Sequence, residues 1–83
     1  MMNQQKVDAL KKEYPQGTRV ELISMAGEPQ MPSGIQGSVF FVDDIGQIHV
    51  EWDNGSTLAL VPGEDSYHKL PDQEQEQFPQ MNL

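Results

Sequence analysis

The chain has 83 residues, no cysteine and a formal net charge of −8 at pH 7. This length allows one small domain, and the lack of cysteine excludes disulfides and thiolate metal sites. No apolar run approaches the ~20 residues that span a bilayer, so we expect a cytoplasmic protein without a membrane segment.

The negative charge lies mainly in the middle of the chain. Residues 1–14 carry a net charge of +1, residues 15–70 a net charge of −6 and residues 71–83 a net charge of −3. Nucleic-acid binding depends on basic residues that neutralise phosphates. The charge therefore disfavours nucleic acid as a partner and favours a basic protein, although acidity also keeps a small protein soluble.

The N-terminal segment is predicted to form one short α-helix. Val7, Leu10 and Tyr14 recur at i, i+3 and i+7, so they share one helix face. Asn3 can cap the helix, and Pro15 ends it because the residue before proline is pushed away from helical angles. So short a helix should form only if its apolar face docks on the rest of the protein.

From Thr18 the apolar period changes to two, which predicts a first strand through about Met25. The sequence "AGEPQMPSG" follows at 26–34, with two prolines, two glycines and no apolar period. We expect it to be an exposed loop, available for contacts through Met31.

The second strand lies in "IQGSVFFVDD" at residues 35–44, where four consecutive residues from Val39 to Val42 are apolar. Apolar side chains on both faces do not fit a regular half-buried strand. The pattern therefore predicts either a bulge near Gly37 or one phenylalanine, Phe40 or Phe41, that points to solvent.

The string "HVEWDNGSTLAL" at residues 49–60 contains an apparent hairpin turn at Asn54-Gly55. Every second residue from Ile48 to Trp52 is apolar, which defines the inward face of this strand. A two-residue turn would set the leucines after the turn against polar positions, so that register is excluded.

A three-residue loop of Asp53, Asn54 and Gly55 instead sets Leu58 and Leu60 on the inward face. This loop is a type I turn followed by a bulge residue in the left-handed conformation, which glycine adopts without steric penalty. Asp and Asn suit the two preceding turn positions.

After this hairpin, Pro62 and Gly63 predict a tight turn, and "SYHKL" predicts a last short strand. Five short strands with tight hairpins usually close their edges, so the predicted fold is mainly β: a five-stranded SH3-like barrel behind one helix. The expected organisation is a helix at 1–15, the barrel at 16–70, and a disordered acidic tail rich in Gln, Glu and Pro at 71–83. The residues expected to be structural are Gly37, Trp52, Asp53, Asn54, Gly55, Pro62 and Gly63.

The string "GIQGSVFFVDDIGQIHVEWDNGSTLALVPGED" closely resembles the domain of unknown function 4314 family, and the likeness runs from about Tyr14 to Leu70. The resemblance implies a small barrel that occurs in bacteria, in their phages and in other mobile elements, and it implies no catalytic residues. The G-x-x-G-x-V spacing of Gly34, Gly37 and Val39 also resembles the start of nucleic-acid-associated SH3-like modules.

The candidate catalytic and metal-binding residues are not arranged in any recognisable catalytic or metal-binding pattern. His49 and Glu51 share one strand face, and His68 lies beside Tyr67, but no nucleophile or second partner stands at a recognisable spacing. The acidic pairs occupy turn positions and do not fit a calcium-binding loop. We therefore expect a protein that is not an enzyme and that has no cofactor or metal.

Protein binding is the better prediction. An exposed Phe40 or Phe41, the loop with Met25 and Met31, and nearby acids could form an apolar patch with an acidic rim that suits a basic protein partner. The opposing interpretation is that the aromatic residues fill the core. The residues predicted to bind are Phe40, Phe41, Asp43, Asp44, Glu51 and Met31.

Three functions follow from these observations. The first is a non-catalytic protein-interaction module of a phage or mobile element. The second is an acidic, phage-type inhibitor of a host nucleic-acid-binding defence protein, similar in action to an anti-CRISPR protein. The third is a nucleic-acid-binding SH3-like barrel, which would need a local basic strip.

Overall fold

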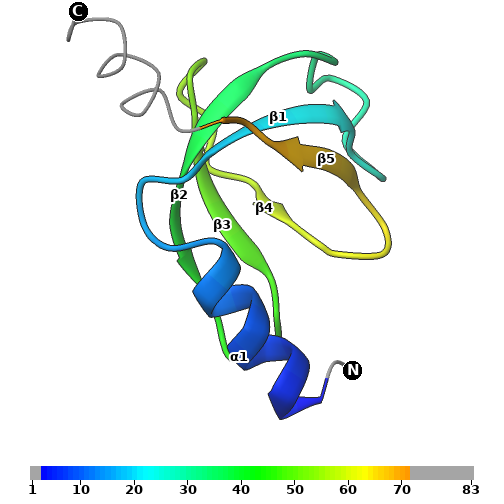
Figure 1. Cartoon of the computed structure of the whole chain (residues 1–83). Coiled ribbons are helices and arrows are strands. Elements are labelled where there is room, and N and C mark those ends of the chain that lie inside the picture. The colour runs from blue at the N-terminus through cyan, green and yellow to red at the C-terminus, as the bar shows by residue number, and fades with distance from the viewer. Residues whose placement is uncertain (1–2, 72–83) are drawn as a thin grey trace, which may run out of the picture.

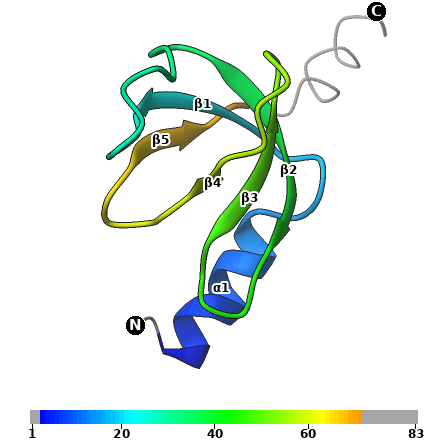
Figure 2. The same ribbon diagram turned by 180° about the vertical axis from the view of Figure 1, so that it is seen from behind.

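The computed structural model describes residues 3–71, and it contains one helix and one five-stranded antiparallel sheet (Figures 1 and 2). The strand order in the sheet is β4-β3-β2-β1-β5. The mainly β class with one N-terminal helix is therefore confirmed, whereas the predicted disordered tail lies almost entirely outside the described residues. The elements are α1 (Gln4–Glu13), β1 (Arg19–Ser24), β2 (Gln36–Val42), β3 (Ile48–Trp52), β4 (Ala59–Leu60) and β5 (Ser66–Lys69).

The sheet curls around the core but does not close into a barrel, so that part of the prediction is wrong. β4 and β5 are its two edges, and within residues 3–71 no ladder joins them. β4 has only two residues, and the turn after it forms local bonds, in which the amides of Glu64 and Asp65 both donate to the Val61 carbonyl. An isolated bridge between Pro62 and Asp65 lies within this same turn, so it does not pair β4 with β5.

The helix forms as the sequence predicts. The Asn3 side chain accepts a hydrogen bond from the Lys6 amide at 2.9 Å, which satisfies a free donor of the first turn. At the other end the Tyr14 amide still donates to the Leu10 carbonyl. Val7 is fully buried, and α1 packs against β2 at one end of the curled sheet (Figure 1). This docking supplies the tertiary support that a ten-residue helix needs.

The β3–β4 turn has the predicted three-residue loop. The Trp52 amide donates to the Ser56 carbonyl at 2.8 Å, and the Gly55 amide donates to the Trp52 carbonyl at 2.9 Å. Gly55 has a φ of +91°, and Ile48 lies opposite Leu60. The register that places every apolar side chain on one face is therefore confirmed.

The bulge in β2 lies at Phe40. β2 and β3 pair in register as far as Val39 opposite Val50, and the pairing resumes with Phe41 opposite His49. Phe40 is thus one extra residue on β2, with no partner of its own on β3.

This bulge decides where both phenylalanines point. Val39 and Val42 are three positions apart and are both buried, which a regular strand with a period of two could not achieve. The extra residue lets both valines face the core and leaves Phe40 and Phe41 exposed by 49% and 45%. Of the two alternatives that the sequence leaves open, a bulge near Gly37 is wrong, because the change of parity is needed between the two valines. The solvent-facing phenylalanine is confirmed, and it holds for both Phe40 and Phe41.

Gly37 has a different structural role, close packing. A Cβ atom at this position would lie 2.7 Å from Val50 Cγ1, 2.8 Å from the Glu51 carbonyl oxygen and 2.9 Å from Trp52 Cε3. No side chain fits there without displacing the β3 backbone, so glycine lets the two strands approach each other.

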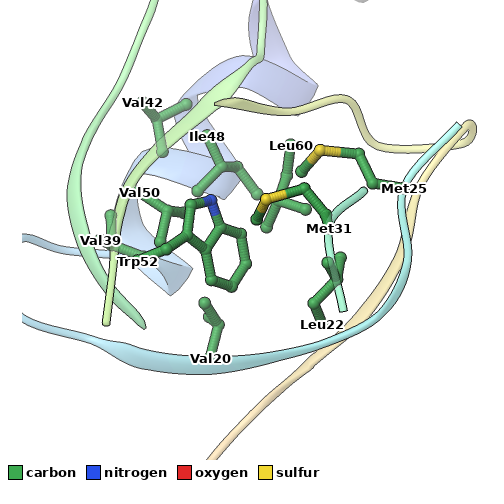
Figure 3. Close-up of a cluster of buried hydrophobic side chains, with 10 residues drawn as sticks. All are labelled: Val20, Leu22, Met25, Met31, Val39, Val42, Ile48, Val50, Trp52 and Leu60. Carbon is green, nitrogen blue, oxygen red and sulfur yellow. The ribbon is translucent and has the colours of Figure 1, made fainter. Parts of the chain in front are cut away.

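The core lies inside the curl of the sheet (Figure 3), and it includes Met31, which is only 8% exposed. The expectation that Met31 contributes to a binding surface is therefore wrong. Because β4 and β5 do not pair, side chains from the β1–β2 loop must complete the core, and Figure 3 shows Met25 and Met31 beside Leu60 of β4. Unbranched methionine adapts well to such an irregular gap. The buried cluster comprises Val20, Leu22, Met25, Met31, Val39, Val42, Ile48, Val50, Trp52 and Leu60.

Within residues 3–71, no helix combines the length and the apolarity required to cross a membrane.

Candidate protein-interaction surface

Phe40, Phe41 and His49 form an aromatic surface on the outer face of β2 and β3. The Phe41 and His49 rings are stacked, with centroids 4.3 Å apart and planes 4° from parallel. The Phe40 ring meets Phe41 edge-on, with centroids 5.4 Å apart. The three rings therefore support one another in a defined arrangement while both phenylalanines remain about half exposed.

Asp43, at the start of the β2–β3 turn, holds this arrangement in place. One of its oxygens, Oδ2, lies 2.9 Å from His49 Nε2, and the other accepts hydrogen bonds from the amides of Ile45 and Gln47 at 3.1 and 2.8 Å. Burial opposes ionisation of Asp43, but the hydrogen bonds from His49 and from the two amides outweigh it and lower its pKa. Both oxygens of Asp43 thus serve the turn and the histidine, so its role is positioning.

The acidic rim of the aromatic surface consists of Asp44 and Glu51. Asp44 pairs with Lys11 of α1 at 2.8 Å, and this hydrogen bond raises the pKa of Lys11. The Asp44 side chain is nevertheless 91% exposed. Glu51 is exposed and lies two residues beyond His49 on the same strand face.

Arg19, the one arginine of the chain, is bound to an acid on the outer face of the sheet. Its guanidinium makes two hydrogen bonds to Asp53, at 2.8 and 3.1 Å, and a third to Ser38 at 2.9 Å. The hydrogen bond from Arg19 lowers the pKa of Asp53. This bidentate pair neutralises the charge that a phosphate contact would need.

Three of the five cationic residues, Lys12, Arg19 and Lys69, line a shallow depression where α1 ends, β1 begins and β5 ends. Arg19 is paired there with Asp53, and Lys69 donates a hydrogen bond to the Glu13 carbonyl at 2.8 Å, which leaves the charge of the ammonium in place. The depression is therefore less basic than its composition indicates only by the one charge that Asp53 neutralises.

Asp65 has a structural role that the sequence did not reveal. Its Oδ1 accepts from the Ala26 amide at 2.8 Å, and its Oδ2 accepts from the Val61 amide at 2.7 Å. One carboxylate thus joins the β1–β2 loop to the end of β4. The sequence shows only an acid in a turn. Both hydrogen-bond donors are backbone amides, which no residue type reveals, and that of Ala26 lies 39 residues away along the chain.

The structure brings most of the predicted binding residues together. Phe40, Phe41 and Glu51 lie on one face, with Asp43 and Asp44 in the adjoining turn, whereas Met31 lies in the core. The sequence suggests His49 only as a catalytic candidate, and its place in the aromatic surface follows from the bulge that sets it opposite Phe41. Within residues 3–71, no group of three or more His, Asp or Glu side chains is arranged to hold a metal ion.

These features define a small mainly β domain whose outer face carries an aromatic surface with an acidic rim. The chain belongs to the family described as Domain of unknown function (DUF4314), whose sequence profile matches residues 3–70. The match includes α1 and all five described strands. No curated protein and no solved structure matches the chain.

Proposed function

We propose that the protein is a non-catalytic interaction module that binds a protein partner through the aromatic surface. The observation that carries this proposal is the bulge at Phe40, which turns two adjacent phenylalanines outward where a regular strand would bury one. Burial of a phenylalanine side chain is worth roughly 1.5–3 kcal/mol, so the domain forgoes stability by exposing both. A partner that covers them would recover this energy, and aromatic residues are enriched at such interfaces.

A basic partner fits the charges around the aromatic surface. Glu51 lies at its rim as an exposed acid, Asp44 lies there paired with Lys11, and the whole chain carries a net charge of −8. Opposite charges increase the association rate and exclude acidic competitors. The charge and the family resemblance together support a protein of a phage or mobile element that acts in the cytoplasm.

The test is a pull-down from a bacterial lysate at low and moderate salt, with the tagged full chain and its Phe40→Ser/Phe41→Ser variant. We expect the double variant to recover at least about tenfold less partner than the unmodified protein, because substitutions at the centre of an interface weaken binding most. Ile23→Ser is a matched control, because Ile23 is 51% exposed on β1, outside the aromatic surface. A double variant that is folded and still recovers every partner would refute the proposal.

The salt dependence of the same experiment separates two versions of the proposal. A basic nucleic-acid-binding protein recovered only at low salt would favour the acidic inhibitor, because charge attraction between exposed groups is screened by salt. A partner that resists salt but is lost in the double variant would favour an apolar interface. Direct nucleic-acid binding has less support, because the guanidinium of Arg19 is bound to Asp53.

A further inference from the structure

Of the three rings that form the aromatic surface, the imidazole of His49 is the ionisable one. Its imidazole is about one-third exposed, stacks on Phe41 at 4.3 Å and lies 2.9 Å from Asp43 Oδ2. Histidine is the side chain whose ordinary titration falls between about pH 5 and pH 8. A change in its charge therefore occurs inside the surface that we assign to partner binding.

The charged groups around His49 are acidic or already neutralised. Asp43 contacts the ring directly, and Glu51 follows on the same face of β3. From α1, Lys11 pairs with Asp44 of the adjoining turn. On β4 the residue opposite His49 is Ala59, which carries no charge. Neutral His49 thus leaves the surface acidic, and a protonated His49 cancels one of the nearby negative charges.

We propose that His49 makes the aromatic surface pH-sensitive, so that a basic partner binds more weakly when the imidazole is protonated. This inference rests on the function proposed above. The reason is charge: the imidazolium repels a cation of the partner, whereas the neutral ring does not.

The direction of the pH dependence follows from the linkage between partner binding and protonation of His49. A bound cation disfavours the proton on His49, so binding is strongest where the imidazole is neutral and falls as the pH decreases. At a solvated surface, the repulsion between the His49 imidazolium and a cation of the partner bound beside it weakens binding by about threefold to tenfold.

The test uses an oligo-arginine peptide as the probe and the full-length protein. Amide NMR spectra locate the bound peptide, and its Kd is measured from about pH 7.5 to about pH 5.5, a range over which histidine titrates while Asp and Glu stay largely ionised. We expect the peptide to shift the signals of Phe40, Phe41 and Glu51, and its Kd to rise about threefold to tenfold at the lower pH.

The matched variants are His49→Gln and His68→Gln. His68 also lies 2.9 Å from a carboxylate, that of Glu21, but on β5 at the opposite edge of the sheet. We expect the Kd of His49→Gln to be independent of pH and that of His68→Gln to change as in the unmodified protein. Thermal melts at the higher pH check that both variants fold.

The outcomes separate the two proposals. Binding at the aromatic surface that is independent of pH, or whose pH dependence survives in His49→Gln, overturns the role of His49 and leaves the interaction surface standing. A peptide that binds elsewhere, or not at all, overturns the basic-partner surface and the pH inference together. A further readout needs no variant: the Phe41 ring signals must shift with the same pH midpoint as the His49 ring signals, and a Phe41 ring that does not follow His49 contradicts the proposal.

Discussion

The carboxylate of Asp65 accepts hydrogen bonds from two backbone amides, those of Ala26 and Val61, that belong to different parts of the chain. Here one side chain joins the β1–β2 loop, which carries Met25 and Met31, to the end of β4. Asp65 thus adds a link from β4 to the loop that completes the core, beside the loop's own backbone hydrogen bonds.

Asp65→Asn is predicted to destabilise the protein by about 1–3 kcal/mol. Asparagine has one acceptor oxygen, so one of the two amides would lose its acceptor and face an NH₂ group instead. The measurement is denaturant unfolding, with hydrogen exchange at Ala26 as the local readout. Glu64→Gln is the control, since Glu64 is an exposed neighbour in the same turn. Equal unfolding midpoints for the two variants would show that the Asp65 bonds contribute little.

At the scale of elements, the β3–β4 hairpin depends on the conformation of one turn residue. Gly55 has a φ of +91° and no heavy atom within 4 Å of the position a Cβ would take. The choice of residue at position 55 is therefore limited by the backbone angle and not by the space for a side chain. The same hairpin sets the register that buries Leu60 and Trp52 together.

Gly55→Val is predicted to cost roughly 1–2 kcal/mol through that backbone angle alone. A β-branched residue disfavours positive φ strongly, so the turn must either strain or change its loop length. Thermal melting measures the loss, with Thr57→Val as the control because Thr57 is exposed two residues further on. A Gly55→Val protein that melts like the unmodified protein would mean that the turn assignment is wrong.

At the scale of the whole molecule, an aromatic contact joins the C-terminal end of α1 to β5. Tyr14, at the end of α1, meets Tyr67 of β5 edge-on with centroids 6.2 Å apart, and Lys69 Nζ lies 5.3 Å from the Tyr14 ring centre. Burial, followed by the neighbouring Tyr14 and acidic residues, raises the pKa of Tyr67 to about 12. Burial also raises the pKa of Tyr14. The packing of the helix against the sheet is thus linked to the neutral form of both tyrosines.

This linkage predicts a loss of stability in alkaline solution. A phenol in the unfolded chain ionises near pH 10, whereas Tyr67 in the folded protein stays neutral until about pH 12. Its contribution is complete below the unfolded pKa and is lost as the pH rises through the folded one. Denaturation midpoints measured across this range should fall less for Tyr67→Phe than for the unmodified protein. Parallel curves for the two proteins would contradict the assignment.

Features that depend on neighbours in the sequence could be predicted from the sequence alone. The Asn3 cap and the end of the helix before Pro15 rest on local backbone chemistry. The three-residue turn at Gly55 rests on the parity of apolar residues on either side of it. The helix and the five strands followed from such patterns, because each of these signals lies within one element and its flanking turns.

Features that depend on distant partners were decided only by the tertiary structure. Met31 is buried because β4 is too short to close the sheet against β5, and no pattern around Met31 shows this. The bulge lies at Phe40 because Val39 and Val42 must both reach one core, whose inner face is defined by other strands. The two hydrogen bonds of Asp65 depend on how the chain continues beyond the short β4, and the stack of His49 on Phe41 depends on the register at the bulge. Turn conformations and the periods of apolar residues depend on neighbouring residues and can be predicted from the sequence. Which side chain covers an open edge of the sheet depends on where distant segments end, so only the tertiary structure decides it.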